Sequence, residues 1–210
     1  MIWRVSNLID QTLINKATKQ FTANNFMSGI NSNPDVEMKN NTMMKFTSPY
    51  DLIAHEYSQY IITNEKIGSI FATKCLSQLY FLWYNTGDYY NYHIDNYPIG
   101  GVNAHLSMTV FLNDDYEGGE LVVKVGGHET VHKPKTGDAI IYDTGLWHKV
   151  NPVTKGDRKV VVGWLESMIS NTFIRNYVIN YGLSLNEMDI SNNDLMTLEQ
   201  FRINLMREYG

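Results

Sequence analysis

The stretch HLSMTVFLNDDYEGGELVVKV (residues 105–125) decides the fold. It contains two apolar runs rich in β-branched residues, 105–113 and 120–125, and the turn-forming segment DDYEGG separates them. Runs of this kind, bounded by Gly- and Asp-rich turns, predict short β-strands. No helical stretch lies between the two runs, so a parallel sheet built from βαβ units is not expected.

The same pattern continues on both sides of this stretch. Further apolar or alternating runs fall at 78–84, 128–133, 139–143 and 158–167, and turn signals such as NTGD and KPKTGD lie between them. About eight short strands between residues 78 and 167, with frequent turn signals, predict a β-sandwich or barrel.

Helices are expected on both sides of the β region. Residues 1–27 and 50–77 predict helical segments, of which the second is broken, and the chain also ends in helices. The apolar face of the first segment consists of Leu13, Ile14, Ala17 and Phe21. The C-terminal apolar stripe consists of Leu195, Leu198, Phe201 and Leu205. Helical spacing within each set predicts one buried face per helix, and the C-terminal stripe is expected to pack on the barrel.

The composition restricts the class of protein. Hydrophobic residues make up 43% of the 210 residues, which is enough for a buried core and suits one domain. The net charge of −5 argues against a nucleic-acid partner bound through general electrostatics. The single cysteine, Cys75, excludes an internal disulfide and a zinc site built on cysteines.

No targeting or membrane segment stands out in the sequence. The N-terminal residues MIWRVSNLIDQ lack the basic stretch and long apolar core of a signal peptide, and no uncharged apolar run reaches membrane-spanning length. The sequence therefore predicts a cytoplasmic protein without a membrane partner. The polar segment 28–41 is expected to form a long loop within the domain.

The segment YHIDN (92–96) raises the question of a metal site. In a strand, residues i and i+2 point to the same face, so His93 and Asp95 can present an imidazole and a carboxylate to one point while Ile94 faces away. A third ligand is needed, and His148 in GLWHKV is the candidate. Two histidines and one carboxylate form the facial triad that suits non-haem Fe(II) and leaves coordination positions open.

An H-x-D pattern alone is common by chance, and a single histidine is more often structural than a metal ligand. Arg158 adds a third feature, because it begins the strand-like run at 158–167. Its planar guanidinium suits a carboxylate and stays charged even when it is partly buried. A β-barrel, an iron triad and an internal arginine together match the needs of a 2-oxoglutarate-dependent oxygenase.

Several ordered motifs resemble the PKHD-type hydroxylases, which form a prolyl 4-hydroxylase-like branch of the Fe(II)/2-oxoglutarate oxygenases. The motifs are KNN (39–41), YNTGDYYNYHIDN (84–96), LSMTVFLNDDYEGGELVV (106–123) and KPKTGDAIIYDTGLWHKVNPVTKGDRKVVVGWLES (133–167). The resemblance covers most of residues 1–180. It implies a mainly β fold, the double-stranded β-helix or jelly roll, with N-terminal and C-terminal helices packed on the barrel.

The resemblance also implies one oxygenase domain over residues 1–210. Within this domain, helical support is expected at about 1–77, the jelly-roll core at about 78–167, and a C-terminal helical extension at 168–210.

The implied cofactor is Fe(II), with 2-oxoglutarate and O2 as cosubstrates and ascorbate as a reductant. The implied iron ligands are His93, Asp95 and His148. Arg158 is implied to bind the distal carboxylate of 2-oxoglutarate, and Tyr84 matches a tyrosine whose hydroxyl often assists cosubstrate binding. Phe111 departs from those relatives that carry a second hydroxylated aromatic residue at this position.

The implied reaction is hydroxylation of an unactivated C–H bond, with release of succinate and CO2. The substrate is either a peptidyl residue, with proline as the family-level expectation, or a free small molecule. Candidate substrate contacts are Tyr89, Tyr90, Tyr97, His105 and Trp147. The loops at 28–49, 85–91 and 98–103 are expected to shape the mouth of the pocket.

Two other classes of protein compete with this interpretation. One is a non-catalytic jelly-roll binding module that has kept its metal, and the retention of all three ligands and the arginine argues against it. The other is a cupin-type metalloenzyme without a cosubstrate. Such enzymes usually carry H-x-H followed closely by glutamate, whereas position 95 is aspartate here.

Overall fold

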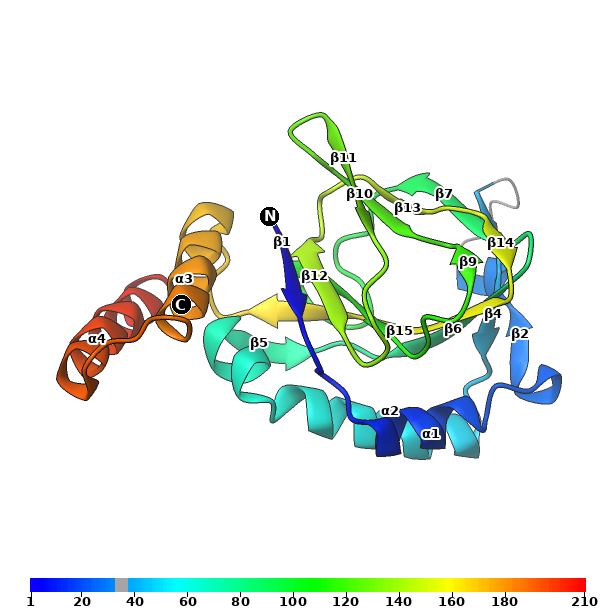
Figure 1. The fold of residues 1–210 in the computed structure, drawn as a ribbon, viewed down its shortest axis with the longest axis horizontal. Coiled ribbons are helices and arrows are strands. Elements are labelled where there is room, and N and C mark those ends of the chain that lie inside the picture. The colour runs from blue at the N-terminus through cyan, green and yellow to red at the C-terminus, as the bar shows by residue number, and fades with distance from the viewer. Residues whose placement is uncertain (33–37) are drawn as a thin grey trace.

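Two antiparallel sheets and a short ribbon form the β core of the computed structural model, in which residues 1–32 and 38–210 are described (Figure 1). The strands of the larger sheet are β1 (Ile2–Val5), β2 (Phe26–Ser28), β4 (Thr42–Met44), β5 (Thr73–Leu76), β6 (Tyr80–Asn85), β8 (Leu106–Phe111), β12 (Ala139–Asp143) and β15 (Asp157–Ser167). Their order is β1-β12-β8-β15-β6-β4-β2, and β5 pairs with β15 outside this path.

The smaller sheet lies opposite the larger one (Figure 1) and carries His93, the first residue of the H-x-D motif. Its strands are β3 (Lys39–Asn40), β7 (Tyr89–His93), β10 (Leu121–Val125), β11 (His128–His132) and β13 (His148–Val150). Their order is β11-β10-β13-β7-β3, and the ribbon pairs β9 (Glu117–Gly118) with β14 (Val153–Lys155). The mainly β core with flanking helices agrees with the predicted fold class.

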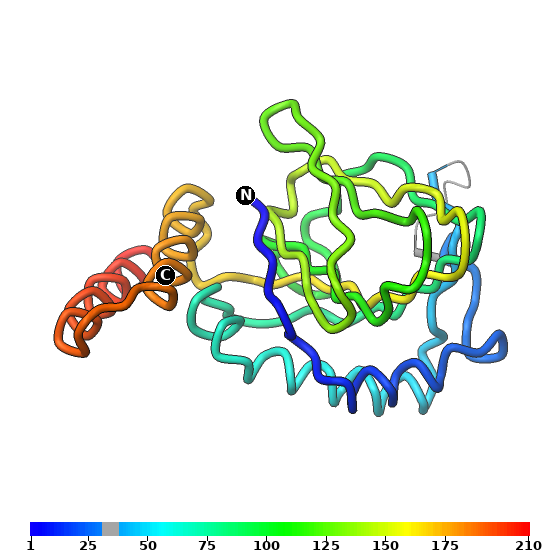
Figure 2. The backbone as a smooth tube through the Cα atoms, in the orientation of Figure 1, coloured from blue at the N-terminus to red at the C-terminus, as the bar shows by residue number. Residues whose placement is uncertain are grey.

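Helices cover one face of the larger sheet and extend beyond one end of it (Figures 1 and 2). The α-helices are α1 (Gln11–Thr18), α2 (Ser48–Ile62), α3 (Thr172–Leu185) and α4 (Asn192–Tyr209). The short helices are η1 (Ala23–Asn25), η2 (Gly29–Ser32) and η3 (Lys66–Ile70), of which η3 is π-helical. No helix in the described part of the chain combines the length and apolar character that a membrane span requires.

Strand β8 explains how the core and the site share one sheet. It lies between β12 and β15, and all of its residues are buried. Because side chains alternate along a strand, Leu106, Met108 and Val110 join the core cluster that also contains the buried residues of α1 and α2. Ser107 and Thr109 line a cavity on the other face. The continuous apolar run predicted at 105–113 is therefore a central strand covered on both faces.

The helix predicted over residues 1–27 is shorter than expected. Ile2–Val5 instead forms an edge strand on β12, because Trp3 and Val5 bury one side of an extended segment. Helix α1 begins after Asp10, whose side chain accepts a hydrogen bond from the amide of Leu13 at 2.9 Å. The predicted residues Leu13, Ile14 and Ala17 are buried on α1, whereas Phe21 is buried beyond its end.

The regions at 28–49 and 50–77 contain more strand than the sequence indicates. Helix α2 ends at Ile62, and Thr73–Leu76 pairs with β15 as β5, so the helical prediction is wrong for these last residues. In the predicted loop, β4 extends the larger sheet beside β6, and β3 extends the smaller one beside β7. Residues 33–37 of this loop lie outside the described residues.

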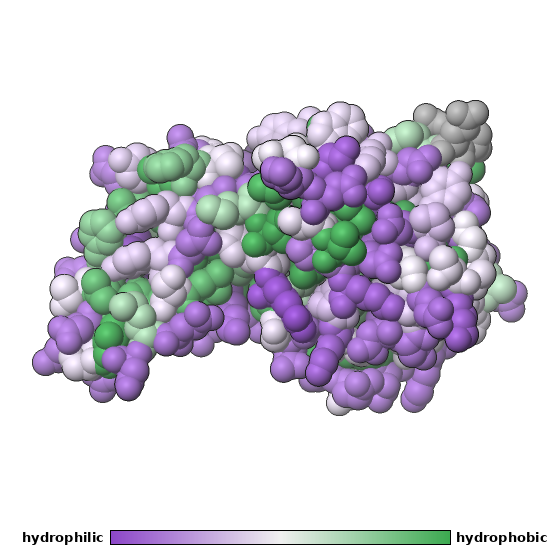
Figure 3. All heavy atoms as spheres, turned by 45° about the horizontal axis from the view of Figure 1, so that its top comes forward, coloured by the Kyte–Doolittle hydropathy of each residue, from purple (hydrophilic) through white to green (hydrophobic). Residues whose placement is uncertain are grey.

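The C-terminal helices form a pair beyond the end of the larger sheet. Helix α4 packs on α3, and Leu205 and Met206 pack against a small cluster of Ala72, Ile169 and Val178. Leu195, Leu198 and Leu205 of the predicted stripe are partly buried, but Phe201 is 50% exposed. Exposed apolar side chains are visible on these helices (Figure 3). The stripe therefore faces α3 more than the barrel.

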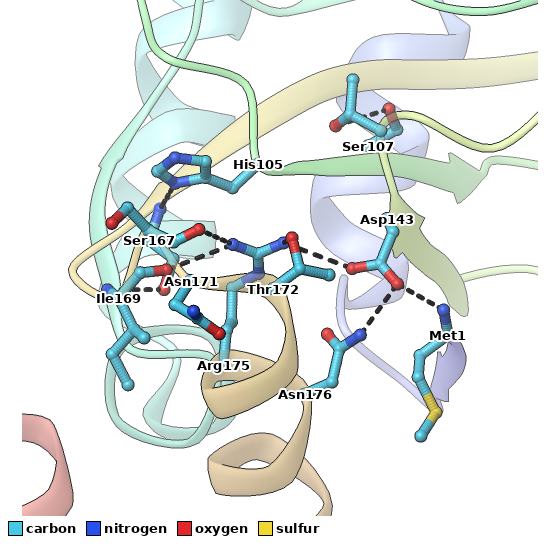
Figure 4. Close-up of polar contacts among 12 residues, drawn as sticks. Met1, His105, Ser107, Asp143, Ser167, Ile169, Asn171, Thr172, Arg175 and Asn176 are labelled. Carbon is cyan, nitrogen blue, oxygen red and sulfur yellow. Dashed lines mark hydrogen bonds and ion pairs between the residues drawn. The ribbon is translucent and has the colours of Figure 1, made fainter. Parts of the chain in front are cut away.

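A buried polar network joins α3 to the end of β12 (Figure 4). Arg175, which is 2% exposed, donates to the carbonyls of Ile169 and Ser170 at 3.2 and 3.0 Å and lies 3.4 Å from Asp143. Asn176 donates to the same carboxylate at 2.9 Å. Burial lowers the pKa of Arg175, and the charge of Asp143 opposes that shift. The carboxylate therefore neutralises a buried cation and fixes α3 to the β core.

Substitution of Asp143 by alanine tests this attachment. The change leaves the Arg175 guanidinium buried without its carboxylate, so we expect the free energy of unfolding to fall by about 3 kcal/mol. Urea unfolding followed by circular dichroism measures the change. The control is Asp189→Ala, because Asp189 is exposed. Equal stabilities of the two variants would contradict the assignment.

Candidate metal centre

The pairing of two strands brings the two histidines together. His93 ends β7 and His148 begins β13, and the antiparallel register places these two residues directly opposite each other. Their ring centroids are 4.1 Å apart. The two histidines are far apart in the sequence, so this contact depends on the fold and not on local spacing.

Asp95 completes the cluster from the segment that follows β7. Its Oδ1 lies 3.8 Å from Nε2 of His93 and 3.7 Å from Nε2 of His148. One ligand atom from each residue lies within 4.8 Å of the other two, and no other group of this kind occurs in the described ranges. Ile94 is 41% exposed and does not line the cavity, and Asp95 reaches the cluster from beyond the end of β7, not from the strand itself as predicted. The donor set of two imidazoles and one carboxylate fits Fe(II) with open coordination positions.

Backbone carbonyls select the tautomer of both histidines. The Nδ1 atoms of His93 and His148 lie 2.8 and 3.0 Å from the carbonyl oxygens of Asn91 and Leu146. Each Nδ1–H therefore donates to a carbonyl, and each Nε2 keeps a lone pair directed to the cluster. Burial and the neighbouring His148 lower the pKa of His93 to about 4, so His93 is neutral at pH 7.

Two residues that the sequence analysis missed hold the carboxylate of Asp95. Trp164 Nε1 and Ser107 Oγ each donate to its Oδ2 at 2.8 Å, which leaves Oδ1 for the cluster. The hydroxyl of Thr144 lies 3.1 Å from that of Ser107. Strand alternation indicates the position of Trp164, because residues an even number of positions apart on a strand share a face. Arg158, Val162 and Trp164 are such residues, and all three line the same cavity.

Arg158 lies in the wall of a cavity of about 260 Å³ that also contains the cluster. Its side chain is 1% exposed, and its guanidinium lies 5.0 Å from the ring of Tyr84 and 5.2 Å from that of Phe111. In the described parts of the chain, no carboxylate forms an ion pair with this guanidinium, and its Nε has no hydrogen-bond partner. A buried cation of this kind favours an anionic ligand in the cavity.

The surroundings of Arg158 contain two tyrosines. Tyr84 lines the cavity opposite Arg158 in the β6–β15 register, and burial raises the pKa of its hydroxyl. Tyr116, which the sequence analysis did not single out, is 3% exposed; burial raises the pKa of its hydroxyl, and the neighbouring charge of Arg158 opposes that shift. Gly119 lets both side chains approach, because a Cβ there would lie 3.1 Å from the Tyr116 ring and 3.2 Å from Cδ of Arg158.

Tyr90 and Lys39 form the wall beside the cluster. The ring of Tyr90 stacks on that of His93, with centroids 3.6 Å apart and an interplanar angle of 18°. Lys39 lies opposite Tyr90 on β3, and its Nζ is 4.8 Å from the centre of the tyrosine ring. Burial lowers the pKa of Lys39 to about 8, and the negative charge of Asp95 opposes that shift.

The other predicted substrate contacts lie outside the cavity wall. Tyr89 is partly buried on β7, while Tyr97 and Trp147 are 64% and 51% exposed. His105 accepts a hydrogen bond from the Ser167 amide at 3.1 Å beside the Arg175 network (Figure 4). Of the five predicted contacts, only Tyr90 lines the cavity.

The predicted loops contribute unevenly to the cavity. Lys39 from 28–49 and Ile99 from 98–103 line it. The predicted turn at 85–91 is wrong for its last residues, because Tyr89 and Tyr90 already belong to β7. The strand there pairs with both β13 and β3, which keeps Tyr90 in place beside His93.

Comparison with known sequences agrees with the resemblance seen in the motifs. Residues 79–166 match the family model of the 2OG-Fe(II) oxygenase superfamily. A PKHD-type hydroxylase of Picosynechococcus sp. is 30% identical over 189 residues, which cover 88% of this chain and 86% of that protein. A PKHD-type hydroxylase of Maricaulis maris is 32% identical over 178 residues, which cover 82% of this chain and 81% of that protein.

Solved structures share the fold. A prolyl-4-hydroxylase of Pseudomonas putida superposes with a TM-score of 0.59 at 15% identity, covering 79% of this chain and 92% of that chain. A prolyl hydroxylase of Trichoplax adhaerens, solved with a peptide fragment of hypoxia inducible factor, gives 0.60 at 15% identity, covering 78% and 82%. These similarities confirm the predicted jelly roll.

Substitution of Trp164 by phenylalanine tests the support of Asp95. The change removes the indole donor but keeps an aromatic ring, so we expect the affinity for Co(II) to fall by about tenfold or more. Calorimetric titration of the metal-free protein measures this affinity. Trp147→Phe is the matched control, because Trp147 lies outside the cavity wall. Unchanged affinity in Trp164→Phe would show that the indole does not orient the carboxylate.

Proposed function

The chain belongs to the PKHD-type hydroxylases, and on this premise we propose that it hydroxylates an unactivated C–H bond with release of succinate and CO2. Membership in this family makes the protein an enzyme that uses Fe(II) and 2-oxoglutarate. The proposed iron ligands are His93, Asp95 and His148. Arg158 and Tyr84 are the proposed binding residues for 2-oxoglutarate.

The buried guanidinium of Arg158, which forms no ion pair with a carboxylate of the described residues, is the observation that carries the proposal. Burial of a charge without a partner is costly, and the distal carboxylate of 2-oxoglutarate removes that cost when it binds. Arg158 and the triad line one cavity, so a molecule with a carboxylate at one end and a chelating keto acid at the other can reach both.

When bound, Fe(II) and 2-oxoglutarate supply the activation of O2, of which one atom enters the substrate C–H bond and the other enters succinate as CO2 leaves. The chain itself positions these groups. His93 and His148 offer Nε2 atoms, because their Nδ1 atoms face backbone carbonyls, and Trp164 and Ser107 orient Asp95. Tyr90 covers one face of His93, which limits the access of water from that side.

A peptidyl residue, with proline as the first candidate, is one proposed substrate class. Support comes from the Trichoplax adhaerens prolyl hydroxylase, which has the same fold and was solved with a bound peptide. A free small molecule is the other class, and the cavity of about 260 Å³ suits either a small molecule or one inserted side chain. The cytoplasmic location stays a prediction from the sequence.

Replacement of the proposed iron ligands tests the reaction class. We expect His93→Ala and Asp95→Ala to abolish succinate formation from 2-oxoglutarate in the presence of Fe(II), O2 and ascorbate, because two ligands do not retain the metal. Succinate is quantified by mass spectrometry. The exposed His128 supplies the control His128→Ala, which should keep native turnover. Native rates of succinate formation in both variants would show that His93 and Asp95 do not hold the iron.

Replacement of Arg158 tests the cosubstrate site separately from the metal. Arg158→Met removes charge-assisted hydrogen bonds worth about 3 kcal/mol, so we expect 2-oxoglutarate to bind roughly a hundredfold more weakly. Anaerobic calorimetry with the metal-loaded protein measures this affinity, and metal binding should be retained. Arg207→Met on the surface of α4 is the matched control. An unchanged affinity of Arg158→Met for 2-oxoglutarate would show that Arg158 does not bind the distal carboxylate.

A further inference from the structure

A buried lysine lies in the cavity beside the proposed metal ligands. The side chain of Lys39 is 4% exposed and lines the same cavity as the triad and Arg158. Its position is set by the β3–β7 pairing, which places it opposite Tyr90. Its ammonium lies 4.8 Å from the centre of the Tyr90 ring, and that ring stacks on His93. A second cation therefore lies in the cavity wall in addition to Arg158.

The positive charges around the cavity outnumber the negative charges of Asp95 and the proposed cosubstrate together. Among the described residues that line the cavity, Lys39 and Arg158 together with a divalent ion would carry four positive charges, while Asp95 carries one negative charge and 2-oxoglutarate carries two. Counted over these lining groups, one positive charge remains after the cosubstrate has bound. Lys39 also has contacts within the protein, but an ammonium group has three donors and can bind a ligand as well. A buried excess of positive charge favours one more anion.

The proposed function already accounts for both ends of 2-oxoglutarate. Arg158 receives the distal carboxylate, and the chelating end lies at the triad. The apolar side chains of Ile99, Val162 and Trp164 line another part of the cavity and suit a carbon skeleton. We infer that Lys39 binds a carboxylate of the substrate, so that this enzyme oxidises a carbon close to a negatively charged group.

This inference rests on the proposed function and names its substrate class. The class consists of carboxylic acids, supplied as free amino acids, as the C-terminal residue of a peptide, or as an acidic side chain. An internal proline between neutral residues does not belong to it. The lysine acts as a specificity-determining residue, and the metal and 2-oxoglutarate bind without it.

Matched pairs of ligands test the inference by binding. The protein is loaded with Zn(II) and N-oxalylglycine, which does not decarboxylate, and titrated with free L-amino acids, with peptides ending in a carboxylate, and with Asp-containing peptides. The neutral partners are the amino-acid amides, the C-terminal peptide amides and the Asn-containing peptides. We expect the native protein to bind at least one acid about tenfold more tightly than its neutral partner. The pair that shows this preference identifies the source of the carboxylate.

Two variants connect this preference to the lysine. Lys39→Met removes the charge but keeps an unbranched side chain only one atom shorter, and it should bind the acid no better than its neutral partner, whereas Lys39→Arg should retain the preference. Lys135→Met is the control, because Lys135 is exposed and lies outside the cavity wall. Affinities for Co(II) and N-oxalylglycine should change less than about twofold in all three variants, because these ligands use other residues.

Three outcomes would overturn the inference. The native protein could bind every acid and its neutral partner equally. Lys39→Met could instead weaken the binding of N-oxalylglycine, which would show that the lysine binds the cosubstrate. The same variant could also weaken the binding of Co(II), which would show that Lys39 positions His93 through Tyr90. Succinate formation by the native protein is measured in parallel, so failure of the proposed function is recognised separately from failure of this inference.

Discussion

The site depends on the register between β7 and β13. His148 meets His93 only because these residues are direct partners across the two antiparallel strands. Side chains alternate between faces, so a slip of one residue would turn one imidazole away from the cavity. β13 is held on its other side by β10, where Val123 is the partner of His148. The register is therefore fixed from both sides of the strand that carries His148.

The two sheets contribute different parts of the site. The smaller sheet supplies the histidines and Lys39, while the larger sheet supplies Arg158, Ser107 and Trp164. Asp95 follows the smaller sheet but is held by two donors from the larger one. Its orientation therefore requires both sheets to face each other. The two histidines and Arg158 therefore come from different sheets and line one cavity, which leaves the space between them for the proposed ligands.

The sequence predicts the parts of the site that strand alternation and motifs encode. His93 and Asp95 are two residues apart, and Arg158 begins a long strand, so these features can be read locally. Trp164 and Ser107 contact Asp95 across the two sheets, and no local pattern reports such a contact. The predicted N-terminal helix is longer than α1, because the helical spacing around Leu13 says nothing about the strand before it. That strand forms only because β12 offers a free edge.

The dipeptide Asp143–Thr144 connects the C-terminal extension to the site. Asp143 bonds outward to Arg175 and Asn176 of α3, while the hydroxyl of Thr144 points inward to Ser107, which donates to Asp95. Both contacts begin at the end of β12, so a shift of this end changes the docking of α3 and the support of the carboxylate together. The extension lies outside the jelly roll, but its anchor is only a few hydrogen bonds from the proposed metal ligand.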